Sequence, residues 1–119
     1  MPLVLVVEPD DALRGVLCQL LARRGYRVLP AAGAAEAEGL ARGRSVDLLL
    51  TEVALPDSTG PALAVLLGAP RVLYTSGTDE DIPAPFLVKP FSPVELLEKV
   101  REVLPSVGWN RTWPVDSGE

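Results

Sequence analysis

Short apolar runs alternate with segments of helical periodicity along most of this chain. The first run, residues 3–7, is unbroken, which is typical of a strand that a parallel sheet buries on both faces. Further strands are predicted at residues 26–29, 46–51, 71–75 and 86–88. Strands that alternate with helices indicate right-handed crossovers and a parallel sheet that is covered on both sides.

Helices are predicted between these strands by the apolar spacing and by signals at their ends. The first covers about residues 10–24, followed by a glycine that permits a left-handed stop. The second covers residues 34–41 and the third residues 61–67. The last helix has the clearest start, because Ser92 and Glu95 fit a capping box with proline at the first helical position.

One connection departs from the alternation of strands and helices. Only ten residues, 76–85, separate the fourth and fifth predicted strands. Parallel strands normally need a crossover of about a dozen residues or more, usually with a helix in it. Ten extended residues span roughly 33 Å, which suffices to return along a strand of about 17 Å. We therefore expect the fourth helix of the fold to be missing or reduced to a turn.

The length of 119 residues allows one domain, which we assign to residues 1–104. Residues 105–119 show no periodicity and read as a tail that contains both tryptophans, Trp109 and Trp113. Two interpretations of the tail stay open. It is either a disordered end or a segment whose aromatic rings cover the apolar surface exposed by the missing helix, in this chain or in a partner.

Composition removes several classes of function. The net charge of -5, with basic residues scattered along the sequence, argues against nucleic acid as a direct partner. No apolar run approaches the roughly 18 residues that a membrane span needs, and the start lacks the pattern of a signal peptide. Cys18 is the one cysteine, so no internal disulfide forms. We expect a cytoplasmic protein that binds neither nucleic acid nor membrane.

Polar residues follow the predicted strands at their carboxyl ends, the edge of a parallel sheet where ligands bind. Glu8 and Asp10 follow the first strand, Glu52 the third, Ser76 the fourth and Lys89 the fifth. Acids hold a hard cation such as Mg²⁺, whereas lysine and hydroxyl donors steady phosphate oxygens. This combination is what a phosphoryl-transfer site requires.

Four segments carry a resemblance to a known family: VLVVEPDDALR, VDLLLTEVALPDSTG, RVLYTSG and FLVKPFSPVELLEKV. In order and spacing they resemble the receiver domain of two-component response regulators, over about residues 3–104. The resemblance implies a flavodoxin-like, doubly wound α/β fold with five parallel strands in the order 2-1-3-4-5. It also implies phosphoryl transfer to an aspartate after the third strand, beside Mg²⁺ held by acids after the first.

Carried over by position, the resemblance assigns a role to each polar residue. Glu52 stands at the phospho-acceptor position, where the family has aspartate. Glu8 takes the first acidic position after the first strand, but Pro9 takes the second, which usually binds Mg²⁺. Ser76 matches the hydroxyl of the switch and Lys89 the invariant lysine.

The resemblance also assigns Phe86 to the switch aromatic and predicts a cis bond between Lys89 and Pro90. Mg²⁺ would rely on Glu8, Glu52 and Asp10 together with waters, so we expect weak binding and no other cofactor. The extra methylene of glutamate moves its carboxylate by about 1.5 Å, and in-line phosphoryl transfer is sensitive at that scale.

Each of these residues also has a structural interpretation. Glu52 and Lys89 form either a plain ion pair or a pair that holds the domain in an active-like state. Asp10 and Asp11 suit a helix start better than a metal site. Asp57, in a loop rich in turn formers, suits a turn better than phosphorylation.

Three hypotheses for function follow. The first is a stand-alone receiver that is not an enzyme, is independent of phosphorylation and binds a signalling protein, with a histidine kinase or a second copy as candidate partners. The second is a receiver phosphorylated by a histidine kinase or acetyl phosphate, on Glu52, Asp10 or Asp57. The third is a small nucleotide-binding enzyme, which residues 8–11 disfavour because their acids would repel phosphate where a Gly-rich turn is expected.

Overall fold

A five-stranded parallel sheet forms the centre of the protein, in a computed structural model that describes residues 1–78 and 82–104. The strands are β1 (Leu3–Val7), β2 (Arg27–Ala31), β3 (Leu48–Glu52), β4 (Val72–Ser76) and β5 (Phe86–Val88). They lie in the order β2-β1-β3-β4-β5. This confirms the predicted flavodoxin-like, doubly wound fold.

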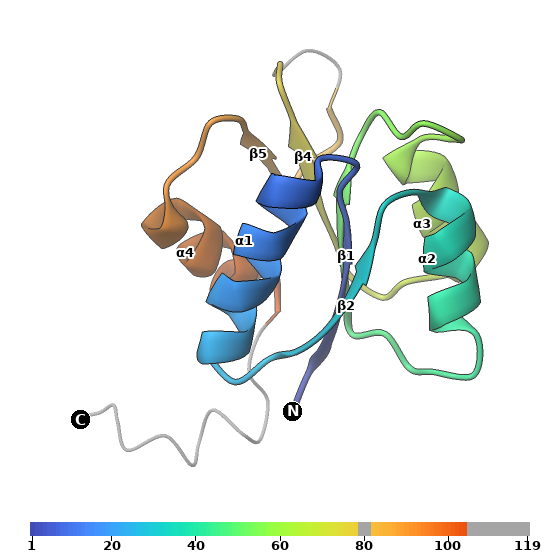
Figure 1. Ribbon diagram of the computed structural model, residues 1–119, viewed down its shortest axis with the longest axis horizontal. Coiled ribbons are helices and arrows are strands. Elements are labelled where there is room, and N and C mark those ends of the chain that lie inside the picture. Colours follow the sequence, from blue (N-terminus) through green and yellow to red (C-terminus); the bar gives the residue numbers. More distant parts are fainter. Residues whose placement is uncertain (79–81, 105–119) are drawn as a thin grey trace.

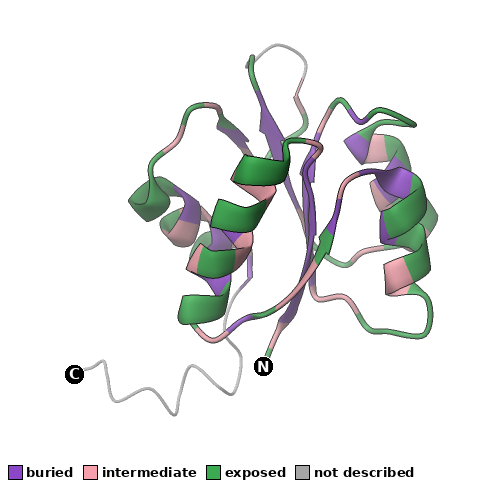
Figure 2. Cartoon of the chain, in the orientation of Figure 1, coloured by how far each residue is buried: buried purple, intermediate pink, exposed green. Residues whose placement is uncertain are grey.

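Two helices cover each face of the sheet (Figure 1). On one face lie α1 (Asp11–Arg23) and α4 (Pro93–Val103), and on the other α2 (Ala34–Ala41) and α3 (Gly60–Leu67). The alternate residues of each strand point to opposite faces. Val4 and Val6 of β1 accordingly pack with α1 and α4, whereas Leu5 and Val7 pack with α2. The unbroken apolar run of β1 is thus buried on both sides, as Figure 2 shows.

The ends of the helices follow the predicted signals. Asp10 caps α1 by accepting the N–H of Leu13, and Gly25 adopts φ +91° just beyond its end. The capping box of α4 is complete, with Ser92 and Glu95 each accepting a backbone N–H from the other. None of the helices in the described ranges is long and apolar enough to cross a membrane.

The bounds of β1 and β5 match the predicted ones, whereas those of β2, β3 and β4 differ from them by one or two residues. We expected the third strand to begin at Val46, but β3 begins at Leu48. Asp47, just before β3, is joined to the start of β1 by two hydrogen bonds: its carboxylate accepts the N–H of Leu3 at 2.8 Å, and its own N–H donates to the carbonyl of Leu3 at 2.9 Å. Glu52 and Ser76, expected just after their strands, are the last residues of β3 and β4.

The link between β4 and β5 contains no helix in its described residues, 77–78 and 82–85, which confirms the reduced fourth helix. The bond between Lys89 and Pro90 is cis, as predicted, and a second cis bond joins Ala84 and Pro85. The tail with Trp109 and Trp113 lies outside the described residues.

Candidate functional site

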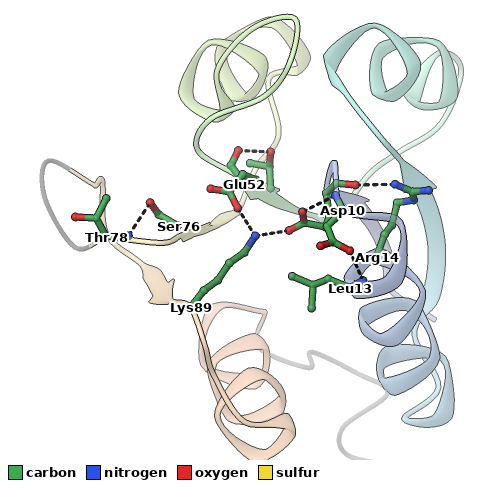
Figure 3. Close-up of polar contacts among 9 residues, drawn as sticks. Asp10, Leu13, Arg14, Glu52, Ser76, Thr78 and Lys89 are labelled. Carbon is green, nitrogen blue, oxygen red and sulfur yellow. Dashed lines mark hydrogen bonds and ion pairs between the residues drawn. The ribbon is translucent and has the colours of Figure 1, made fainter.

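The ammonium group of Lys89 lies between two carboxylates at the carboxyl edge of the sheet (Figure 3). Its Nζ is 2.8 Å from Oε1 of Glu8 and 2.5 Å from Oε1 of Glu52. We call Glu8, Glu52 and Lys89 the ion triad. The sequence predicts all three residues at one site, and the structure brings them together.

The register of the sheet places these side chains. Val7 and Thr51 are partners in the pairing of β1 with β3, so the residues that follow them, Glu8 and Glu52, are neighbours. Lys89 follows β5, and its backbone N–H donates to the carbonyl of Ser76 at 2.7 Å. Its long side chain crosses the end of β4 to reach the two acids, a reach that the four-carbon stem of lysine permits.

The two carboxylates of the triad are buried, and the half-buried Lys89 is their common partner. Glu8 is 3% exposed and Glu52 9% exposed, so each charge needs a partner. The second carboxylate oxygen of Glu8 accepts the N–H of Asp10 at 2.9 Å. Burial lowers the pKa of Lys89, but the hydrogen bonds and charges of Glu52 and Glu8 outweigh that effect and hold the pKa above its ordinary value.

The residues of this edge do not fit a Mg²⁺ site. Within the described part of the chain, no three acidic, cysteine or histidine side chains are placed to hold a metal ion. Glu8 and Glu52 already bind an ammonium group, and Pro9 has no carboxylate to add. Asp10, the third metal candidate, directs Oδ1 to the N–H of Leu13 at 3.0 Å. The donor set therefore resembles an ion pair more than the oxygen shell of a divalent cation.

The two residues assigned to a switch lie on β4 and β5, the strands that precede Lys89. Ser76 is 7% exposed, and its hydroxyl accepts the N–H of Thr78 at 3.3 Å (Figure 3). No hydrogen bond joins this hydroxyl to the triad in the described structure. Phe86 opens β5, half-buried, three residues before Lys89, with Tyr74 as its partner on β4. The strand pairing thus places Phe86 next to an aromatic residue of the neighbouring strand.

The start of α1 has a structural part beside the triad. Asp10 is the N-cap, which agrees with the interpretation of this acid as a helix start. Arg14 donates to the carbonyl of Glu8 at 2.8 Å and pairs with Asp11 at 2.6 Å. Arg14 of α1 therefore connects the helix to the residue that follows β1, which is itself a member of the triad. Sequence analysis did not assign a role to Arg14.

Asp57 has a structural role that sequence analysis missed. Its two carboxylate oxygens accept the N–H groups of Ala34 and Ala35, at 2.8 and 2.9 Å. Gly33, the N-cap of α2, provides no side-chain hydrogen bond, so Asp57 caps the helix from the loop after β3. These N–H groups hold the pKa of Asp57 below its ordinary value, the one from Ala35 most strongly. The sequence shows only that a helix preceded by glycine lacks a side-chain cap of its own, and it does not indicate which residue supplies one.

Chemically, the edge is a closed ionic cluster. The carboxylate at the third strand is bound to an ammonium group, and the acids nearby cap helices. A phosphoryl acceptor needs an available oxygen and cations that neutralise the incoming charge. Here the cation that lies between the carboxylates, Lys89, already has two anionic partners.

Comparison with known proteins finds relatives among bacterial regulatory proteins and sensor kinases. No protein-family model matches the chain. It is 32% identical over 113 residues to an uncharacterized transcriptional regulatory protein, YbdJ, of Bacillus subtilis, covering 85% of this chain and 50% of that protein. It is 35% identical over 116 residues to sensor kinase CckA of Brucella abortus, covering 85% of this chain and 12% of the kinase. The chain thus spans about half the length of the first relative and a small part of the second.

The fold agrees with these sequence matches. The crystal structure of a receiver domain from hybrid histidine kinase CckA superposes on this chain with a TM-score of 0.75 and 37% identity. The superposition covers 86% of this chain and 98% of that receiver domain. The likeness therefore extends over nearly the whole of a solved domain.

Proposed function

This chain belongs to the receiver-domain family of two-component response regulators, and from that premise we propose that it works without phosphorylation, by binding another signalling protein. Its role is that of an interaction module rather than an enzyme. The partner class that its relatives suggest is a histidine kinase or a protein that acts beside one, since one relative is a sensor kinase.

The ion triad is the observation that carries this proposal. Glu52 stands where the family carries its phosphorylated aspartate, and its carboxylate is bound to Lys89. An incoming phosphoryl group would have to displace that ammonium group from two enclosed carboxylates, at a cost of several kcal/mol. Pro9 removes the acid that would otherwise hold a compensating metal ion.

Phosphorylation at a neighbouring aspartate is the second candidate function. Asp10 and Asp57 are the acids considered for it, and each accepts backbone N–H groups at a helix start. Modification of either would remove a helix cap and so destabilise the start of a helix. The structure offers neither of them a lysine partner of the kind that Glu52 has. These contacts favour the first function.

The test is phosphorylation by a small donor. Native protein is incubated with Mg²⁺ and acetyl phosphate or phosphoramidate, and its intact mass is recorded. Two variants are treated in parallel, Glu52→Asp and the double variant Pro9→Asp with Glu52→Asp, which restores both family positions. Glu52→Ala is the matched control without an acceptor.

We expect no mass change in native protein and in Glu52→Ala, and the mass of one phosphoryl group on the double variant. That result would mean a receiver scaffold whose site has been closed by substitution. A phosphoryl group on native protein would overturn the proposal, and peptide mapping would then identify Glu52, Asp10 or Asp57 as the acceptor.

A further inference from the structure

Seven arginines gather at the end of the domain opposite to the ion triad. In a parallel sheet all strands begin at one edge, and the helices that return to them end there (Figure 1). The arginines lie at these helix ends and strand starts: Arg23, Arg24, Arg27, Arg42, Arg44, Arg71 and Arg101. We call this group the arginine pole. In the sequence these residues are scattered, and only the topology brings them to one end.

The charge of the arginine pole is not neutralised within the described structure. All seven side chains belong to exposed residues, and none forms a salt bridge there. The carbonyl ends of α1 to α4 contribute roughly half a negative charge each, or about two in total. Seven guanidinium groups exceed that amount several-fold. At this end seven arginines thus outnumber the two acids of the adjacent groove, Glu38 and Asp47, although the whole protein has a net charge of -5.

An open groove lies within this end, between the last turns of α2 and α3. Its volume is about 510 Å³, in the range of sites that bind a peptide side chain or a small ligand. The apolar side chains of the lining come from the end of α3 and the residues after it, together with two residues that follow α2 or end it: Leu66, Leu67, Ala69, Pro70, Ala41 and Val46. Leu66 is 62% exposed, which is unusual for a large apolar side chain.

Arg42 and Arg44 flank the apolar lining of the groove. Arg44 donates one N–H to the carbonyl of Leu40 at 2.6 Å, so the rest of its guanidinium fork is available to a ligand. Two acids, Glu38 and Asp47, also line the groove, but Asp47 is already bound to the N–H of Leu3. In the described structure, Glu38 is thus the one groove acid that forms no hydrogen bond or ion pair.

We propose that this groove and the arginine pole bind an acidic peptide segment of a partner protein, with one large apolar side chain seated against Leu66. Charge complementarity attracts the peptide and speeds its encounter with the protein, and the apolar contact fixes the position of the peptide along the groove. The surface lies at the end of the sheet away from Glu52, so the inference goes beyond the proposed function and does not depend on phosphorylation.

A peptide fits this surface better than a nucleic acid does. The lining has an exposed leucine and no aromatic ring on which a base could stack. The carboxylates of Glu38 and Asp47 would repel a continuous phosphate backbone, whereas a peptide can place its acidic residues selectively over the arginines.

The test uses the full chain, isotope-labelled, and a synthetic peptide with one leucine between two runs of three glutamates. Amide chemical shifts report both the position and the affinity of binding. The same peptide with serine in place of leucine measures the apolar contact, and a short DNA duplex is the competing ligand. A chain ended at residue 104, which retains every helix and strand described, tests whether the protein's own tail occupies the groove.

Matched variants separate the groove from its surroundings. Arg42→Glu with Arg44→Glu should weaken binding by about tenfold or more, whereas Arg23→Glu with Arg24→Glu changes the same charge outside the groove and should have a smaller effect. Leu66→Ser should weaken binding, and its neighbour Val65→Ser, 84% exposed and outside the groove, should not.

The expected result is saturable binding with shifts centred on residues 41–47 and 66–70, stronger with leucine than with serine in the peptide. Shifts centred on the ion triad, or equal affinity of the two arginine double variants, would overturn the proposal.

Tighter binding of the DNA duplex would assign the pole to nucleic acid instead. Binding that appears only in the chain ended at residue 104 would make the tail the occupant. Self-association that the Arg42→Glu, Arg44→Glu pair abolishes would make it a second copy. Neither outcome of the phosphorylation test alters these readings.

Discussion

Lys89 Nζ lies 2.8 Å from Oε1 of Glu8, a residue 81 positions earlier in the chain. The contact joins the end of the first strand to the end of the last, across the carboxyl edge of the sheet. Glu8 is almost fully enclosed, so its charge depends on this partner. The ion pair therefore has a stability consequence that a surface pair would not have.

Replacement of Lys89 should show that consequence. In Lys89→Met, Glu8 and Glu52 remain enclosed without a cation, and we expect a loss of about 2–3 kcal/mol in the free energy of unfolding. Lys99→Met is the control, because Lys99 pairs with Glu102, which is 67% exposed, and such pairs contribute under about 1 kcal/mol. Urea unfolding of both variants measures the difference. Equal losses in the two would contradict an enclosed triad.

Alkaline pH should remove the same stabilisation. The pKa of Lys89 in the folded protein lies above its ordinary value of 10.5. Its contribution is therefore fully present below that ordinary value and is lost as the pH rises through the folded pKa. We expect the stability difference between native protein and Lys89→Met to stay constant from neutral pH up to about 10 and to shrink above. Tyr26 and Tyr74, whose pKa values burial raises, affect both proteins alike and cancel in the difference.

Asp57 should stabilise α2 in a pH-dependent way. Since its pKa in the folded protein lies below the ordinary 3.8, its contribution is present above that value and is lost as the pH falls through the folded pKa. Asp57→Ala should therefore melt at a lower temperature than native protein near neutral pH, and the two should converge in strong acid. Thermal unfolding followed by circular dichroism measures this. Asp11→Ala removes an 88% exposed carboxylate and serves as the control with a smaller expected change.

Gly33 supplies an independent check on the Asp57 cap. A Cβ atom at Gly33 would lie 2.9 Å from Oδ1 of Asp57, too close for an undisturbed contact. Gly33→Ala should thus be more destabilising in native protein than in the Asp57→Ala background. Additive effects of the two changes would show that the carboxylate does not sit against Gly33 in solution.

Replacement of two other glycines by alanine should change the stability of the protein in opposite directions. Gly39 is exposed in the middle of α2, and a Cβ atom at this position would have open space around it. Gly39→Ala should therefore stabilise the protein by about 0.5–1 kcal/mol. At Gly60 the Cβ would lie 2.7 Å from the carbonyl oxygen of Glu52, so Gly60→Ala should destabilise by about 1–3 kcal/mol. Urea unfolding of the two variants tests both signs.

The sequence alone was sufficient for the fold and for much of the site. The unbroken run of β1, the helix at residues 34–41 and the capping box of α4 are local signals, and each element formed where they indicate. The order of the polar residues after the strands likewise predicted that Glu8, Glu52 and Lys89 would meet, because the strands of a parallel sheet end at one edge. Strand boundaries were less accurate, because they depend on hydrogen bonds between strands, which the local pattern does not show.

Only the tertiary structure decided which side chains of distant segments pair with one another. Lys89 could have paired with either acid or neither, and the register of four strands made it bridge both. Asp57 contacts α2 because the loop after β3 folds over the start of that helix. The arginines of the pole lie at one end of the domain because the helices end, and the strands begin, at the same edge of the sheet. Short-range periodicity and caps determine elements, whereas register and crossover direction determine which side chains meet, and these depend on the whole sheet.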